Sequence, residues 1–180
     1  MNTRIATLLT VVALTAAGLV AFFPNAKEPG QASPSREKIQ WHECNEGISL
    51  ARQKNKKILI DVYTDWCSWC KKMDKEVYTD EEVRKAIASS FVAVKLNAES
   101  SKAVTFNGDQ TDEATFARAI GVTGYPTTVF LEPTAQPITT ISGYMQSKDF
   151  ASALRYVGGD HYKRGSFDQF RSSEKSSQLK

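Results

Sequence analysis

Apolar residues along the chain recur at two spacings, and the shorter one predicts four strands. Residues 58–63 and 91–96 are β-branched, apolar runs of strand length, which predict buried strands. Residues 127–131 and 138–141 form a second pair of such runs. The turn residues at 133–136 lie between the members of this pair, so we expect an antiparallel hairpin there.

Apolar residues at the longer spacing, three to four positions apart, predict helices between these strands. The predicted stripes are Cys44, Ile48 and Ala51; Cys70, Met73 and Val77; Phe116 and Ile120; and Phe150, Leu154 and Val157. The capping-box pattern Thr79–Glu82 marks the start of a further helix or a break in the one before it. Residues 98–111 show no period and predict a loop.

The resulting order of elements is α, β, α(α), β, α, β, β, α. A strand–helix–strand step favours a right-handed crossover between parallel neighbours. The final hairpin adds an antiparallel strand. The pattern therefore predicts an α/β fold in which a mixed sheet, parallel strands plus a C-terminal antiparallel hairpin, carries helices on both faces.

The N-terminal residues follow a different pattern from the rest of the chain. Arg4 precedes a run of 19 residues without a charge, residues 5–23, which is typical of an export signal. The same run is close to the ~20 residues that span a bilayer, so an uncleaved membrane anchor is the alternative. Both interpretations place the remaining chain outside the cytoplasm; a buried core helix is a third interpretation.

These patterns divide the chain into four parts. Residues 1–26 are the predicted signal peptide or anchor, and residues 27–39 are rich in Pro, Gly, Ser and charge, which predicts a flexible linker. Residues 40–158 form the predicted domain, and residues 159–180 are a polar tail. The net charge of +3 is small and no basic tract alternates with aromatics, so nucleic-acid binding is not expected.

The candidate chemistry lies where the first strand ends, at Cys67-Ser-Trp-Cys70. Two residues at i and i+3 of a helix lie roughly 5–6 Å apart on one face, a separation that a disulfide accepts. Unpaired N–H groups and the helix dipole would stabilise a thiolate on Cys67 at the start of the helix. A structural disulfide and a metal pair are the alternatives, although His42 and His161 have no ligand spacing.

The third cysteine, Cys44, is left over by this pairing. It shares an apolar stripe with Ile48 and Ala51, which favours a buried core position. A second redox thiol or an intermolecular bridge is the alternative.

Five features in order make the chain resemble the thioredoxin superfamily over residues 40–158. They are Asp61 six residues before Cys67; Trp66-Cys67-x-x-Cys70-Lys71; Val94-Lys95-Leu96-Asn97; Gly124-Tyr125-Pro126-Thr127; and Gly143 after the last strand. Within the superfamily, Asp61 to Asp80 is similar to the C-terminal periplasmic domain of the membrane reductase DsbD and to its exported relatives. The chain differs from thioredoxin proper by Ser68-Trp69 in place of Gly-Pro and by a longer segment at 98–111.

The resemblance implies roles for the residues behind and between the cysteines. Cys67 is expected to attack as a thiolate and Cys70 to resolve the mixed disulfide. Asp61, if buried, would accept the proton of Cys70; a solvated aspartate at a strand end is the alternative. Lys95 would tune Asp61 or be a plain surface lysine, and Asp74 would assist or be an ordinary helix-face charge.

The resemblance also implies a surface for partners. We expect a cis bond before Pro126, and the backbone of Tyr125 would pair with an extended substrate. Trp66 and Trp69, with Tyr125, are expected to form an exposed apolar rim rather than to fill the core.

The sequence therefore predicts an exported or periplasmic thiol–disulfide oxidoreductase, soluble or tethered through residues 5–23, that acts as a protein-disulfide reductase. The direction follows from the resemblance alone. Its expected partners are disulfide-bearing exported proteins and a DsbD-like membrane electron donor, with no cofactor and no metal. The alternatives are a copper-binding or chaperone module whose dithiol holds Cu(I), and a disulfide oxidase or isomerase.

Overall fold

A mixed five-stranded sheet in the order β1-β3-β2-β6-β7 organises the computed structural model, which describes residues 38–178. Its strands are β1 (Trp41–His42), β2 (Lys57–Tyr63), β3 (Phe91–Asn97), β6 (Thr127–Leu131) and β7 (Pro137–Ser142). The helices are α1 (Cys44–Lys54), α2 (Ser68–Glu76), α3 (Glu81–Ser90), α4 (Glu113–Ala119), α5 (Ser147–Gly158) and α6 (Phe167–Gln178). A separate two-stranded sheet consists of β4 (Ala103–Phe106) and β5 (Asp109–Asp112).

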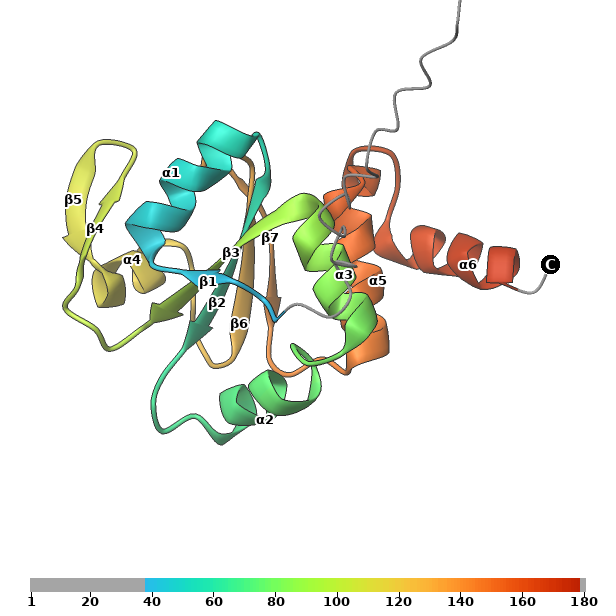
Figure 1. Cartoon of the computed structure of the whole chain (residues 1–180), viewed down its shortest axis with the longest axis horizontal. Helices are drawn as coiled ribbons and strands as arrows, with labels where there is room; N and C mark the ends of the chain where they lie inside the picture. Colours follow the sequence, from blue (N-terminus) through green and yellow to red (C-terminus); the bar gives the residue numbers. More distant parts are fainter. Residues whose placement is uncertain (1–37, 179–180) are drawn as a thin grey trace, which may run out of the picture. The chain divides into compact units, whose positions relative to one another are not determined.

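Helices cover both faces of the sheet, which confirms the predicted architecture. Figure 1 shows α1 and α4 on one face and α3 and α5 on the other. Successive side chains of a strand point to opposite faces, and β2 follows this rule. Ile58 and Ile60 pack in the core beneath α1 and α4, whereas Leu59 packs in the core beneath α3 and α5.

The predicted parallel direction of successive strands is found for β2 and β3 but not for β6. Strands β2 and β3 are parallel, with Asp61 opposite Lys95. The next strand of this sheet along the chain, β6, runs antiparallel to β2 and does not pair with β3. The expected parallel orientation applies to neighbours joined by a helical crossover, and β6 instead joins the far side of β2. The predicted β6–β7 hairpin is confirmed.

The segment 98–111 is not the loop that its lack of period predicted, because β4 and β5 form a hairpin within it. Strands of four residues are too short to show a convincing alternation. Within β4 and β5 only Val104 is buried. Asn107 and Gly108 both have positive φ angles, 53° and 96°, which a two-residue hairpin turn requires.

The predicted capping box at Thr79–Glu82 is wrong in its register. Asp80 is the N-cap of α3, and its Oδ1 accepts hydrogen bonds from the backbone N–H groups of Glu82 (2.9 Å) and Val83 (3.2 Å). The Thr79 hydroxyl instead donates to the Lys75 carbonyl at 2.7 Å. The start of a new helix at this place is as predicted.

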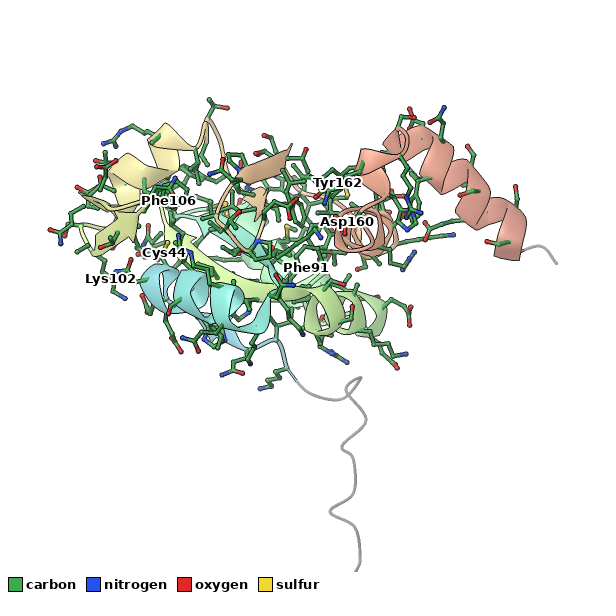
Figure 2. The ribbon with its side chains drawn as sticks, turned by 90° about the horizontal axis from the view of Figure 1, so that it is seen from above. Cys44, Phe91, Lys102, Phe106, Asp160 and Tyr162 are labelled. Carbon is green, nitrogen blue, oxygen red and sulfur yellow. A yellow bond between two sulfur atoms is a disulfide. The ribbon has the colours of Figure 1, made fainter. Side chains whose placement is uncertain are left out.

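The C-terminal residues, described from their composition as a polar tail, contain a 3₁₀ turn (His161–Lys163) and α6. The ring of Tyr156 on α5 contacts the rings of Tyr162, Phe167 and Phe170, with centroids 5.3–6.5 Å apart. Figure 2 shows Asp160 and Tyr162 beside α5, where the chain turns toward α6. Aromatic residues that are widely spaced in the sequence therefore attach this segment to α5.

The predicted signal or anchor, residues 1–26, and all but the end of the predicted linker lie outside the described residues. Among the residues that the structure does describe, no helix combines the length and the apolar character needed to cross a membrane.

Candidate active site

The two cysteines lie where β2 ends and α2 begins, and they form a disulfide with a Cα–Cα distance of 5.3 Å. Cys67 is the N-cap of α2, and its sulfur accepts the backbone N–H of Cys70 at 3.0 Å. The predicted strand–turn–helix arrangement is therefore confirmed. A helix N-terminus favours negative charge on sulfur, so the fold stabilises a thiolate at Cys67 once the bond is reduced.

In this oxidised form the disulfide is largely covered. Cys67 keeps 4% of its accessible surface and Cys70 keeps 3%. The neighbouring tryptophans are in the opposite situation, since Trp66 is 66% exposed and Trp69 is 53% exposed. The expected exposed apolar rim is present, and it surrounds a dithiol that offers only a narrow point of attack.

The first part of this rim joins the dithiol loop to the loop before β6. The rings of Trp66 and Tyr125 meet edge to face with centroids 5.9 Å apart. The Trp66 indole N–H donates to Glu99 at 2.9 Å. Tyr125 precedes Pro126, and the bond between them is cis, as predicted. The structure thus brings the cis-proline loop beside the cysteines through a contact between two aromatic side chains.

The second part of the rim joins α2 to the loop between β7 and α5. The rings of Trp69 and Tyr144 lie 5.4 Å apart, and the Lys72 ammonium is 5.0 Å and 5.1 Å from them. The Tyr144 hydroxyl donates to Glu76 at 3.0 Å. Gly143, immediately before Tyr144, has a φ of 87° and donates to the Pro126 carbonyl at 2.8 Å. Three loops therefore converge around the disulfide.

Three charged side chains meet on the face of the sheet that packs under α2. The Lys95 ammonium lies 2.5 Å from Asp61 Oδ2 and 2.5 Å from Asp74 Oδ1. The register of β2 and β3 places Asp61 beside Lys95, and α2 brings Asp74 from above. Asp74 is one turn after Cys70, so this cluster is attached to the dithiol helix.

Burial and charge act on this cluster in opposite directions. Asp61 is 2% exposed, and burial raises its pKa above the ordinary value while Lys95 opposes the rise. Burial alone would lower the pKa of Lys95, but the two carboxylates together raise it. Asp61 is therefore a carboxyl group that holds a proton more readily than an exposed aspartate does, beside a lysine that stays charged.

Three aromatic rings also lie close to the Lys95 ammonium. The ammonium lies 4.7 Å from the ring centroid of Trp41 and 5.3 Å from those of Tyr63 and Tyr78. Tyr78 is buried, and burial followed by the charge of Asp61 raises the pKa of its hydroxyl well above the ordinary value. Cation–π contacts of this kind favour the charged form of the lysine.

Cys44 lies in the core, as expected from its stripe. It is 2% exposed at the start of α1, and burial followed by the charge of Glu113 raises the pKa of its thiol to about 12. Figure 2 shows it on the side of the molecule that carries Phe106 and the β4–β5 hairpin. Within the described part of the chain, no three His, Cys, Asp or Glu side chains cluster in a way that could hold a metal ion.

The charged groups of this site are predicted from the sequence, whereas Trp41, Tyr63 and Tyr144 are not. Tyr144 follows Gly143 directly, so the glycine–aromatic pair was the available signal for the second part of the rim. Trp41 and Tyr63 carry no comparable signal, because the side chains around Lys95 come from β1, β2 and the end of α2. Such a cage depends on the order of strands in the sheet.

Comparisons with known proteins agree with this geometry. A family model described as a thioredoxin-like domain matches residues 44–158. The thiol:disulfide interchange protein DsbD of Escherichia coli K12 is 32% identical over 109 residues, which are 59% of this chain and 18% of that protein. The chain thus corresponds to less than a fifth of the length of this curated relative.

Two solved structures show the same fold. A thioredoxin from Thermus thermophilus superposes with a TM-score of 0.56 at 23% identity, covering 67% of this chain and 88% of the thioredoxin. A DsbH oxidoreductase superposes with a TM-score of 0.52 at 18% identity, covering 72% of this chain and 91% of the other. The matched family model, the fold and the Cys67–Cys70 disulfide together establish that this chain belongs to the thioredoxin-like family.

Proposed function

We propose that this protein is an extracytoplasmic thiol–disulfide oxidoreductase that reduces disulfides in other proteins through Cys67 and Cys70. The observation that carries the proposal is a disulfide at the N-terminus of α2, surrounded by three converging loops with exposed aromatic side chains. A structural disulfide of this kind closes a loop too short to stabilise the fold much. An exposed aromatic rim around it has an evident use in contacting another protein.

The reaction proceeds in two exchange steps. The Cys67 thiolate attacks one sulfur of a partner disulfide, which forms a mixed disulfide and releases the other partner sulfur as a thiolate. Cys70 then gives its proton to Asp61 and attacks the Cys67 sulfur, which releases the second partner thiolate. Two electrons pass to the partner, the enzyme ends as the Cys67–Cys70 disulfide, and the released thiolates take protons from solvent.

The rim residues give this exchange its binding surface. Trp66 with Tyr125, and Trp69 with Tyr144, would receive apolar side chains on either side of the partner's cysteine. The backbone of Tyr125 would pair with an extended partner segment. Among the described residues no backbone hydrogen bond of the turns and loops involves Tyr125, which leaves its polar groups available.

Reduction is the direction we propose, with electrons supplied by a DsbD-like membrane protein. The support is the 32% identity to DsbD over 109 residues. Export or membrane tethering rests on the uncharged run at residues 5–23 and on the same relative. Disulfide-bearing exported proteins are then the substrates.

Differential alkylation of the reduced protein tests the assignment of the two thiols. With brief iodoacetamide treatment at pH 7, Cys67 should be labelled first and Cys70 should be protected. A reduced Cys70→Ser variant should accumulate a mixed disulfide with a substrate that contains disulfides, such as insulin. A Cys67→Ser variant should be inactive. Absence of labelling at both cysteines would mean that the covered site never opens, and the proposal would fail.

The reduction potential of the pair tests the direction. A value near about −270 mV, as in thioredoxin, supports a reductase, and a value near about −120 mV, as in DsbA, would assign an oxidase instead.

A further inference from the structure

A continuous chain of charged groups leads from the buried carboxyl group to solvent. Asp61 is 2% exposed in its side chain, Lys95 is 23% exposed and Asp74 is 50% exposed. The lysine ammonium is 2.5 Å from an oxygen of each carboxylate, so the three groups are joined by two short ion pairs. The chain becomes steadily more exposed from Asp61 outward.

The two oxygens of Asp61 have different surroundings. Oδ2 is bound to Lys95, whereas Oδ1 is buried and has no partner of full hydrogen-bond geometry among the described residues. The buried Tyr78 hydroxyl acts on the carboxyl group as a donor that lowers its pKa. A buried acceptor without a partner is uncommon and calls for an explanation. Oδ1 of the Asp61 carboxylate can therefore accept a proton. Oδ2 stays beside the Lys95 ammonium, which can pass a proton on.

We propose that Lys95 and Asp74 carry protons between Asp61 and solvent, with Asp74 as the outer end of the path. The inference rests on the proposed function, in which Asp61 receives the proton of Cys70. In the transfer, Lys95 gives one proton to Asp74 and takes one from protonated Asp61. Asp61 becomes a carboxylate, Lys95 remains an ammonium and Asp74 becomes a carboxylic acid that exchanges with water, so charge and protons balance.

Aromatic rings lie close to the ammonium beside the two carboxylates. The ring centroids of Trp41, Tyr63 and Tyr78 are 4.7 Å, 5.3 Å and 5.3 Å from it, and Tyr78 is 5% exposed. The titratable groups that face the cluster are the three charged residues with Tyr63 and Tyr78, whereas Asp65, Lys102 and Glu113 act on the pKa of Tyr63. Asp74, on α2, is the half-exposed member of this set in direct contact with Lys95.

The test is chemical rescue of an Asp74→Asn variant of the full chain. The rate of the second exchange step, in which the mixed disulfide is resolved, is followed by rapid mixing at pH 7 in a low buffer concentration. Removing the outer end of the path should slow this step at least about tenfold. Imidazole at increasing concentration should restore the rate, because it can exchange protons with the partly exposed Lys95 directly. The native protein should be insensitive to imidazole.

Matched variants separate this role from a structural one. Glu82→Gln removes an exposed carboxylate that pairs with Lys85 at 3.2 Å and does not touch Lys95, so it should behave as the native protein. Lys95→Met should slow the same step but should not be rescued by imidazole, because Asp61 is only 2% exposed and the side chain through which imidazole would act is gone. The double variant Lys95→Met with Asp74→Asn should be no slower than the slower single variant.

Two results would overturn the inference. A normal rate in Asp74→Asn at low buffer would show that the proton leaves elsewhere, and a slow rate that imidazole does not restore would assign Asp74 a structural role. In both cases the rate of the variant is compared with that of the native protein, which must itself be active. Loss of exchange in the native protein itself, or activity retained by Cys67→Ser, would instead refute the proposed function.

Discussion

Asp61 lies in the central strand β2 with 2% of its surface exposed, on the face of the sheet that packs under α2, and this burial determines its titration. Burial raises the pKa of Asp61 in the folded protein, so the folded state keeps its proton to a higher pH than the unfolded chain does. Between the ordinary pKa of about 3.9 and the raised folded value, the native state binds more protons, so its stability falls as pH rises. At neutral pH the buried carboxylate is therefore a net cost to the fold.

An Asp61→Asn variant should remove this cost. Its stability should exceed that of the native protein at pH 8, and the difference should shrink toward pH 4, where Asp61 is protonated in the native protein. Lys95 keeps Asp74 as its partner in the variant. Urea unfolding at the two pH values measures the difference, with Glu82→Gln as the control. A difference that does not change with pH would contradict the assignment.

The thiol of Cys44 lies in an environment that disfavours its ionised form, in contrast to that of Cys67. It is buried with a pKa of about 12, whereas the helix N-terminus favours a thiolate at Cys67. We expect Cys44 in the folded, oxidised protein to resist alkylation for hours at pH 8, because only about one thiol in 10⁴ is ionised at that pH. Unfolding in urea should expose it at once. Mass spectrometry of the labelled protein reads the site, and rapid labelling in the native state would contradict a core position.

Helix α1 contacts the sheet at Gly47 and the β4–β5 hairpin at Asn45. At Gly47 the helix approaches β3 so closely that a Cβ atom would lie 2.2 Å from Val94 Cγ2, a distance that real Cβ contacts do not show. The Asn45 amide reaches the hairpin on the other side: Nδ2 donates to the Ala103 carbonyl at 2.9 Å and Oδ1 accepts the Thr105 N–H at 2.8 Å. The hairpin is therefore attached to α1 by side-chain hydrogen bonds.

Replacing Asn45 by Ala should loosen the hairpin without unfolding the domain. Loss of two hydrogen bonds at about 1 kcal/mol each should lower the protection of the Thr105 amide against hydrogen exchange by roughly tenfold or more. Amides of β2 should be unaffected because that strand is central to the sheet. Ser49→Ala, on the same helix, is the control. Unchanged protection at Thr105 would show that the hairpin is held by other contacts.

At the scale of the whole molecule, the redox site and the C-terminal helix use different parts of the fold. Helix α6 packs on α5 through Phe167 and Phe170 against Tyr156. Its ion pairs join Arg171 to Asp149 at 2.5 Å and Glu174 to Arg155 at 2.6 Å. In the described part of the chain, none of these contacts includes a residue of the dithiol, the aromatic rim or the Lys95 cluster.

Ending the chain after Ser166 should therefore cost stability but not chemistry. Exposure of Tyr156 and loss of two partly buried phenylalanines should lower the free energy of unfolding by about 2 kcal/mol. The rate of insulin reduction at 25 °C should stay within about twofold of that of the full chain. Denaturant unfolding and the insulin assay measure the two quantities on one sample. A large fall in activity with unchanged stability would place α6 in the partner surface.

The sequence alone determined those features that depend on neighbours within about ten residues. The apolar, β-branched run of β2 and the i, i+3 spacing of the cysteines predicted a strand, a turn and a helix with both sulfurs at its start, and the structure has that arrangement. The β6–β7 hairpin and its turn were predicted for the same reason. The short β4–β5 hairpin was missed, because four-residue strands carry too little periodicity to be told from a loop.

Only the tertiary structure decided which distant residues meet. The antiparallel direction of β6, the closure of Lys95 between Asp61 and Asp74, and the contact between Trp69 and Tyr144 join segments far apart in the chain. Local propensities cannot specify such pairs, because strand order and helix docking follow from burying the whole apolar surface at once. The reacting cysteines could be named from the sequence. The groups that set the charge of the neighbouring side chains and the exposure of the disulfide to a partner were brought together only by the fold.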